Sequence, residues 1–327
     1  MTKPLVVAML AFVAAGCASR LDIQGHRGAR GLVPENTLPA FERGIDLGVT
    51  TLELDVAVTR DGVVVISHDA ALNPDITRGP DGAFLADRGP AIHDLTYDEL
   101  QRYDVGRLNP ARNYAKAFPE QQPVDGTRIP RLADLFALAR RKGDRVQFNV
   151  EIKSDPTRPE LSLAPEPFAR AVLDVIRREG MERRVTLQSF DWRPLEVVHR
   201  LAPRIDTAYL TVRATGFDTI CAGPAAGKRD IPAADCAPSP WTGSFQYRDY
   251  GSVPKMVKAA GGSVWSPRYQ DVDEALLREA HALGLRVIVW TVNDPAVISK
   301  MLELGVDGII SDRPDVVMKL ARDRAAR

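Results

Sequence analysis

The sequence lacks an excess of charge of either sign, and this absence excludes one class of partner. Its 327 residues include 43 Lys and Arg and 43 Asp and Glu, so the formal net charge at neutral pH is zero. A chain without a net positive field has no general attraction for nucleic acid or for an anionic membrane surface. We therefore expect no nucleic-acid partner, and nothing in the sequence implies a protein partner.

The N-terminal apolar stretch is too short to span a membrane. Residues 5–15 form an uncharged run of eleven residues, whereas a bilayer-spanning helix needs roughly 20. Such a run near the N-terminus is typical of a secretory signal peptide, and Ala14-Ala15-Gly16-Cys17 resembles a bacterial lipobox. We expect a signal peptide over residues 1–16, a lipid on Cys17, and a periplasmic protein exported across the inner membrane. The membrane contact would be the lipid anchor alone. Plain signal cleavage and an uncleaved membrane helix are the alternatives.

Cysteine is scarce, with three residues in the chain. Cys221 and Cys236 are separated by fourteen residues of a Gly- and Pro-rich stretch, and neither His nor a CxxC pattern stands nearby. That absence does not favour a metal site. In an oxidising compartment the pair predicts a disulfide, with two reduced thiols as the alternative.

The composition is that of a globular α/β protein. Apolar residues make up 45% and charged residues 26% of the chain, which supplies ample material for a core. No internal repeat or low-complexity segment is visible, and 24 Gly with 24 Pro are normal for a chain with many strand-to-helix turns.

Eight short apolar runs alternate with eight helical patterns. The expected strands are residues 21–25, 51–56, 146–152, 185–190, 207–210, 263–266, 286–292 and 306–311. The expected helices are residues 38–48, 132–142, 166–179, 192–202, 253–260, 271–284, 295–304 and 314–324. This count predicts a (β/α)₈ TIM barrel occupying residues 17–327.

Three segments depart from the simple alternation. The run 63–67 follows Asp61-Gly62, a hairpin signal, so we expect it to fold back on the second strand and to return His68 to the vicinity of Asp55. The long connections 69–131 and 212–252 both follow strand ends, where a barrel carries its active site. We therefore expect two loop insertions at the active-site end.

Acidic residues alternate with apolar ones along two of the expected strands. Glu53 and Asp55 share the inward face of the second strand, and Glu151 and Lys153 share that of the third. Buried carboxylates repel one another unless a cation lies between them, and oxygen ligands select a hard divalent ion such as Ca²⁺ or Mg²⁺. The alternative is a structural ion-pair network of Glu53, Asp55 and Lys153 with Arg27.

A His and an Arg end the first strand. His26 and Arg27 stand in Gly25-His26-Arg27-Gly28, where the glycines would allow close approach of a ligand. An imidazole can transfer protons near neutral pH and a guanidinium can grip phosphate oxygens. The pair therefore suits phosphate chemistry, and His68-Asp69 ends the hairpin in a similar way.

Together these motifs form a set that points to one family. The set comprises Gly25-His26-Arg27-Gly28-Ala29, Pro34-Glu35-Asn36-Thr37, Glu53-Leu54-Asp55, Thr59-Arg60-Asp61-Gly62, His68-Asp69, Glu151-Ile152-Lys153, Gln188-Ser189-Phe190, Trp290-Thr291-Val292-Asn293 and Gly308-Ile309-Ile310-Ser311-Asp312. In this order, and along nearly the whole chain after the signal, it resembles the glycerophosphodiester phosphodiesterase family, most of all the bacterial periplasmic form. The chain departs from the family pattern at Ser311, where Thr is usual, and in 212–252, which has no counterpart.

The resemblance implies a role for each site residue. Glu53, Asp55 and Glu151 would hold one divalent cation, Ca²⁺ ahead of Mg²⁺. His26 and His68 would be the acid/base pair, and Arg27 and Lys153 would bind the phosphate. Phe190 and Trp290 would line the pocket against the glycerol carbons, although aromatic residues in strands are often plain core.

The resemblance also implies an activity. The enzyme would hydrolyse deacylated phospholipids such as glycerophosphocholine or glycerophosphoethanolamine to sn-glycerol 3-phosphate and an alcohol. The nucleophile, water or the neighbouring glycerol hydroxyl, is left open. The alternatives are a phosphodiesterase acting on lysophospholipids and a catalytically idle surface-binding lipoprotein on the same barrel.

Overall fold

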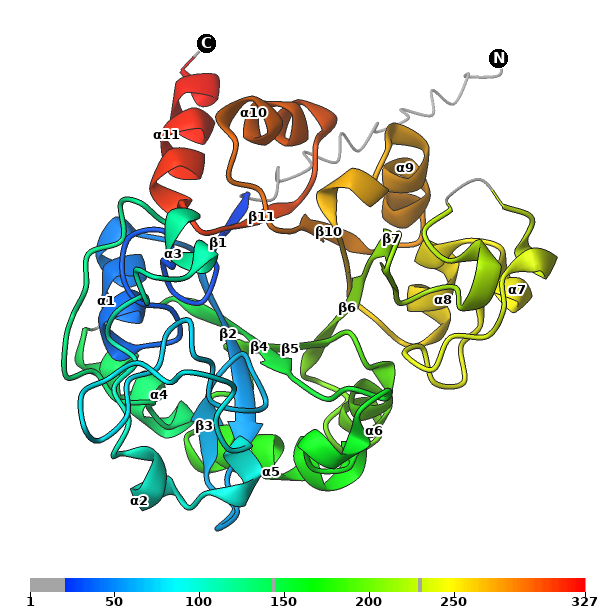
Figure 1. Cartoon of the computed structure of the whole chain (residues 1–327). Coiled ribbons are helices and arrows are strands. Elements are labelled where there is room, and N and C mark those ends of the chain that lie inside the picture. The colour runs from blue at the N-terminus through cyan, green and yellow to red at the C-terminus, as the bar shows by residue number, and fades with distance from the viewer. Residues whose placement is uncertain (1–20, 143–144, 229–230, 327) are drawn as a thin grey trace, which may run out of the picture.

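The computed structural model describes residues 21–142, 145–228 and 231–326 (Figure 1). The expected signal peptide and Cys17 lie outside these residues. No helix in the described part of the chain has both the length and the apolar character needed to cross a membrane.

Eight parallel strands form a closed barrel, as the sequence predicts. They are β1 (Asp22–Gly25), β2 (Thr51–Val58), β4 (Gln147–Ile152), β5 (Val185–Ser189), β6 (Asp206–Thr211), β9 (Val264–Pro267), β10 (Arg286–Val289) and β11 (Gly308–Ser311). Each strand pairs in parallel with the next, and β1 pairs with both β2 and β11, which closes the ring. Inside this ring the side chains of the strand ends face one another.

Eight helices surround the ring of strands (Figure 1). They are α1 (Leu38–Leu47), α4 (Leu132–Arg141), α5 (Pro165–Arg178), α6 (Trp192–Leu201), α8 (Val253–Ala259), α9 (Glu274–Ala282), α10 (Pro295–Leu304) and α11 (Pro314–Ala325). Helix α1 shows the local rules at work, because the Thr37 side chain caps its N-terminus and Gly48 ends it in a left-handed conformation. Each expected helix is confirmed.

The main core lies between the barrel and its helices. On β2, Leu52, Leu54 and Val56 point outward and are fully buried with Phe41 of α1. The intervening residues of β2 must then face the barrel interior. This alternation places Glu53 and Asp55 inside the ring.

The hairpin that the sequence predicts is confirmed. Strand β3 (Val64–Ile66) runs antiparallel to the end of β2 and does not join the ring. The backbone N–H of Ser67 donates to the Asp55 carbonyl at 3.0 Å. His68 therefore returns to the end of β2.

The first long connection, residues 69–131, folds over the end of the barrel with short helices of its own. These are η1 (Ile92–Asp94), α2 (Tyr97–Leu100) and α3 (Asn113–Lys116). Leu72, Ile92 and Leu100 belong to a small separate core beneath it. The segment is thus a packed insertion and not an open loop.

The second long connection, residues 212–252, follows β6. It contains the hairpin β7 (Arg213–Ala214) and β8 (Phe217–Asp218), the turns η3 (Gly223–Ala225) and η4 (Ala233–Asp235), and α7 (Tyr247–Tyr250). A disulfide joins Cys221 to Cys236, the two cysteines whose pairing the sequence predicts, with 5.2 Å between their Cα atoms. Two further single turns, η2 (Pro159–Leu161) and η5 (Tyr269–Asp271), follow β4 and β9.

Candidate active site

A cavity of about 170 Å³ lies at the carboxyl ends of the barrel strands. It is lined by His26, Arg27, Arg30, Glu53, Asp55, His68, Glu151, Lys153, Gln188, Phe190, Leu210, Trp290, Thr291 and Ile310. All nine residues to which the sequence assigns a catalytic, metal, phosphate or pocket role are therefore brought to one place. This cavity is called the inner cavity below.

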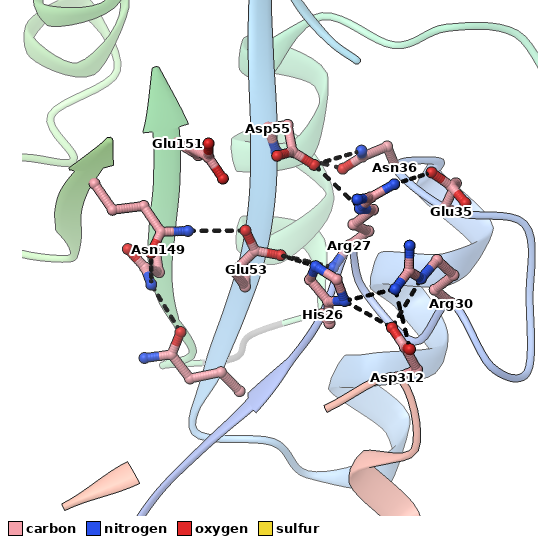
Figure 2. Close-up of polar contacts among 12 residues, drawn as sticks. His26, Arg27, Arg30, Glu35, Asn36, Glu53, Asp55, Asn149, Glu151 and Asp312 are labelled. Carbon is pink, nitrogen blue, oxygen red and sulfur yellow. Dashed lines mark hydrogen bonds and ion pairs between the residues drawn. The ribbon is translucent and has the colours of Figure 1, made fainter. Parts of the chain in front are cut away.

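Three carboxylates converge in the inner cavity (Figure 2). Asp55 of β2 lies beside Glu151 of β4 in the strand register, and Glu53 precedes them on β2. Each offers an oxygen atom, and these oxygens all lie within 4.8 Å of one another. All three residues are buried. Burial and mutual repulsion raise the pKa of Glu53 well above its usual range, and burial raises the pKa of Glu151 to about 7. The positive charge near the three carboxylates is therefore too small to keep all of them ionised.

The neighbouring cations balance only part of this cluster. Lys153 Nζ lies 2.9 Å from Glu151 and 3.8 Å from Asp55, and Arg27 Nε lies 3.4 Å from Asp55. Burial would raise the pKa of the Asp55 carboxyl, but the nearby positive groups outweigh it and hold that pKa well below its usual range. The ion-pair network that is the alternative reading thus exists around Asp55 and Glu151.

Glu53 is the member of the cluster that the ion-pair network leaves out. Its oxygens accept hydrogen bonds from the Gln188 side-chain amide at 2.9 Å and from the Arg27 backbone N–H at 2.8 Å. Its nearest ionisable partner is the imidazole of His26, with Nε2 at 3.9 Å. A buried carboxylate without a full cation beside it, at the centre of an all-oxygen donor set, fits a hard divalent ion.

A carboxylate binds the His26 ring on the side that faces away from Glu53. Its Nδ1 lies 2.6 Å from Asp312, so the Nδ1–H donates to that carboxylate and Nε2 faces Glu53 (Figure 2). Arg30 binds the same carboxylate through two nitrogens, at 2.8 and 3.0 Å. Burial, with the Arg30 charge as the next cause, lowers the pKa of His26 to about 4. The imidazole is therefore neutral at pH 7, with a free lone pair on Nε2.

His68 has a more open setting than His26. Its side chain is 31% exposed, and Nδ1 lies 3.3 Å from Asp69. Burial of the ring lowers the pKa of His68, and the charges of Arg27 and Lys153 add to this effect. The two cations that would bind a phosphate are thus among the groups that disfavour protonation of this imidazole.

The fold itself requires the two glycines around His26. A Cβ on Gly25 would meet the Gly28 carbonyl oxygen at 1.9 Å, and a Cβ on Gly28 would meet Ala40 of α1. These contacts explain the glycines without a ligand, and the expected approach of a ligand stays a prediction. Between them Arg27 adopts a left-handed conformation with φ of 49°. Such backbone strain in a residue other than glycine is often stored at functional sites. Here it turns the Arg27 side chain toward Asp55.

The first insertion reaches Arg27, the expected phosphate ligand, through one further residue. The guanidinium of Arg27 donates to Glu35, and the Tyr114 hydroxyl of α3 donates to the other oxygen of Glu35. Arg30 in turn donates to the Tyr114 hydroxyl at 3.0 Å. Insertion 69–131 therefore helps to fix the position of Arg27.

The sequence assigns no role to Arg30, Asp312 or Tyr114. For Asp312 a signal was present, because it follows β11, the neighbour of β1 in the barrel, and polar residues at adjacent strand ends meet. Arg30 follows His26 by one helix-like turn, with its N–H bonded to the His26 carbonyl. Tyr114 lies in an insertion, where no periodic pattern places a side chain.

A comparison with family models finds one family. The model described as the glycerophosphoryl diester phosphodiesterase family matches residues 26–316. Among curated proteins, a glycerophosphodiester phosphodiesterase of Caldanaerobacter subterraneus is 27% identical over 298 residues, which cover 91% of this chain and 96% of the relative. One of Bacillus altitudinis is 28% identical, over 92% of this chain and 98% of the relative.

Solved structures share the fold. A putative glycerophosphoryl diester phosphodiesterase of Silicibacter pomeroyi matches with a TM-score of 0.79 and 36% identity, over 94% of this chain and 95% of that one. A phosphodiesterase of Oleispira antarctica, solved with the product sn-glycerol-3-phosphate, matches with a TM-score of 0.64 over 92% of this chain and 96% of its own. At 20% identity the second likeness shows the fold alone.

Proposed function

The chain belongs to the glycerophosphoryl diester phosphodiesterase family, and from this premise we propose that it hydrolyses glycerophosphodiesters in the inner cavity with the help of one bound divalent cation. The observation that carries the proposal is the convergence of three carboxylates, two histidines, an arginine and a lysine in that cavity. A phosphodiester is anionic and has a poor leaving group, so its hydrolysis needs charge neutralisation and two proton transfers. The cavity offers groups for each task.

The negative charge of the phosphate would be neutralised by the cation that the acidic cluster holds and by two basic side chains. Glu53, Asp55 and Glu151 would hold Ca²⁺ or, as the alternative, Mg²⁺. When bound, such a cation supplies positive charge to the phosphate oxygens. Arg27 and Lys153 lie beside the same carboxylates, where they would bind the remaining phosphate oxygens and orient the diester.

The two histidines would transfer the protons. His26 presents the lone pair of Nε2 while Asp312 holds Nδ1–H, which suits a proton acceptor. His68 would donate to the departing alcohol. An anionic diester between Arg27 and Lys153 offsets the two charges that lower the pKa of His68, so substrate binding favours the protonated imidazole.

The reaction would consume one water and break the phosphorus–oxygen bond to the head group. The products would be sn-glycerol 3-phosphate and an alcohol such as choline or ethanolamine. Phe190 and Trp290, with ring centroids 5.3 Å apart, line the cavity where the glycerol carbons would lie. A hydroxyl of the glycerol is the alternative nucleophile to water.

A small substrate panel tests this function. The protein is incubated with glycerophosphocholine, glycerophosphoethanolamine and glycerophosphoglycerol, and glycerol phosphate and the alcohol are measured. We expect both products in equal amounts from at least one member. An idle surface-binding lipoprotein would release neither, and that result, obtained with Ca²⁺ and with Mg²⁺ present, would refute the proposal.

Anchoring by lipid is a separate part of the proposal. It rests on the lipobox-like sequence that ends at Cys17, preceded by the apolar stretch 5–15. A Cys17→Ser protein should leave the detergent phase while keeping its activity, because the site residues lie in the barrel. A Cys17→Ser protein that still partitions with membranes would favour the uncleaved helix instead.

A further inference from the structure

A much larger cleft adjoins the inner cavity, and the hydrolysis proposed above does not require it. This outer cleft has a volume of about 960 Å³ and shares five lining residues with the inner cavity, namely His68, Glu151, Lys153, Phe190 and Trp290. Its outer wall is built by insertion 212–252, including Val212, Ala214, Phe217 and Trp241. A glycerophosphodiester with a small head group would leave most of this space unfilled.

A continuous row of aromatic rings leads from the inner cavity along the outer cleft. Trp290 contacts Phe190 at 5.3 Å between centroids, Phe190 contacts Phe217 at 5.8 Å, and Phe217 contacts Trp241 at 5.4 Å. The first two rings line both spaces, and the last two come from the insertion. Phe217 is 43% exposed, one of two large hydrophobic residues left exposed in the part of the chain that the structure describes. Phe190, Trp241 and Trp290 are half-buried, so the row as a whole presents a contiguous apolar surface beside the inner cavity, which is typical of a ligand-binding groove.

The geometry of the row favours a flexible chain over a flat group, and the carboxylates of the cleft already have partners. Successive rings meet at 90°, 57° and 82°, so they form a corrugated wall and not a flat platform on which a sugar ring could stack. Four carboxylates line the cleft, and each has partners. Asp69 accepts from the Asn73 side-chain amide at 2.8 Å, and Glu151 pairs with Lys153 at 2.9 Å. Asp155 accepts from Arg158 at 2.9 Å, and Asp218 accepts three backbone N–H groups at 2.8 to 2.9 Å. None of the four is an unpaired anion for an ethanolamine ammonium.

We propose that the outer cleft binds the acyl chain of a monoacyl glycerophosphodiester, whose phosphodiester lies in the inner cavity and whose chain follows Phe190, Phe217 and Trp241. The proposal rests on the proposed function, because it uses the same phosphate site and the glycerol position beside Phe190 and Trp290. The reaction is unchanged in kind. Water adds to phosphorus, the bond to the head-group oxygen breaks, the alcohol leaves with a proton, and the acylglycerol phosphate remains.

A chain-length series tests the proposal. The substrates are glycerophosphocholine and its 1-acetyl, 1-butanoyl, 1-hexanoyl and 1-octanoyl esters, kept below the concentration at which they form micelles, and choline release is measured. All four esters keep the 2-hydroxyl free, so the series changes the chain and not the candidate nucleophile. We expect kcat/KM for the octanoyl ester to exceed that for glycerophosphocholine by about tenfold or more, because methylene groups are removed from water along the row.

Variants at Phe217, the exposed ring of the row, show whether the cleft causes this gain. Phe217→Asp should lower the octanoyl-to-unacylated ratio of kcat/KM by roughly tenfold, and Phe217→Leu should restore most of it, since Leu keeps an apolar surface. Because Phe217 is 43% exposed and lies outside the barrel core, neither change should prevent folding. The matched control is Val124→Asp, at the other exposed large hydrophobic residue (38%), which lies outside the cleft and should leave the ratio unchanged.

Three results would overturn the proposal, and they separate it from the proposed function. If glycerophosphocholine is cleaved but acyl chains bring no gain, or Phe217→Asp does not reduce the gain, the cleft does not bind the chain and the proposed function stands. If Phe217→Asp instead changes the preference among glycerophosphocholine, glycerophosphoinositol and glycerophosphoglycerol, the cleft binds the head group. If no diester of either kind is cleaved, both proposals fail.

Discussion

The inner cavity and the outer cleft adjoin each other but are built from different parts of the chain. The inner cavity, about 170 Å³, is lined mainly by polar and charged residues at the ends of barrel strands, and its three carboxylates and two arginines are buried. The outer cleft, about 960 Å³, receives Phe217 and Trp241 from an insertion closed by the Cys221–Cys236 disulfide. The barrel therefore carries the groups that suit bond cleavage, while the insertion can change the range of substrates without disturbing them.

The largest effect should come from an inner histidine. His26→Ala should lower kcat by roughly 10² to 10⁴, because it removes the lone pair that we propose accepts a proton in the transition state. His281→Ala is the matched control, since His281 also bonds an aspartate, Asp307 at 2.8 Å, but on an exposed surface outside both spaces. Steady-state kinetics with glycerophosphocholine checks this. Near-normal turnover by His26→Ala would remove the acid/base assignment.

A smaller loss is expected at the residue that orients this histidine. Asp312→Asn keeps the shape of the side chain but replaces the carboxylate that accepts the His26 Nδ1–H, so the favoured tautomer is lost. We expect kcat to fall roughly 10²-fold while KM changes little. Burial and Arg30 lower the pKa of His26, and the Asp312 carboxylate raises it. Removing the carboxylate should therefore leave the low-pH limb of the rate profile in place or move it to lower pH. A shift of that limb to higher pH would contradict the orienting role.

A still smaller effect tests whether the two insertions differ. Insertion 69–131 reaches the charged inner residue Arg27 by hydrogen bonds, through Tyr114 and Glu35. The second insertion instead reaches the inner cavity by an apolar contact of Phe217 with Phe190. Tyr114→Phe removes two hydrogen bonds, the one donated to Glu35 and the one accepted from Arg30. The bond to Glu35 alone contributes about 1 kcal/mol, so KM should rise at least roughly fivefold with a minor change in kcat. Tyr103→Phe, in the same insertion but outside the cavity lining, is the control. An equal rise in KM for both variants would mean that the insertion acts through stability alone.

The smallest effect is a pH-dependent shift in thermal stability. Without a cation, Glu151 has a pKa near 7 and Glu53 a raised one, so the folded chain binds more protons at these sites than the unfolded chain does above pH about 4.5. These two groups therefore reduce the free energy of unfolding as pH rises toward 7. A bound cation replaces those protons, so the rise in Tm on adding Ca²⁺ should be larger at pH 8 than at pH 5, by a few degrees. An equal rise at both pH values would place the ion elsewhere, and Glu151→Gln should reduce the rise at pH 8.

The barrel and the inner residues could be predicted from the sequence because both depend on strands. Side chains alternate along a strand with a period of two, and all strands of a barrel end at the same rim. Once eight βα units are recognised, Glu53, Asp55, Glu151 and His26 are therefore expected to lie close together. The outer cleft could not be predicted. Phe217 lies in a two-residue strand, and its contacts with Phe190 and Trp241 depend on how an irregular, disulfide-closed insertion packs. The steric need for the glycines near His26 could not be predicted either, since the contact of Gly28 with α1 arises only in the folded chain.

The central claim is that the three buried carboxylates of the inner cavity hold a catalytic divalent cation. The most direct measurement is turnover of glycerophosphocholine by protein stripped with a strong chelator, followed by titration with Ca²⁺, Mg²⁺ and softer ions, with the metal content found by elemental analysis. The account predicts no turnover by the stripped protein and recovery with Ca²⁺ or Mg²⁺ at one ion per chain. Full activity in the chelator, with no metal found, would contradict it and would leave Glu53, Asp55 and Glu151 as part of an ion-pair network with Arg27 and Lys153.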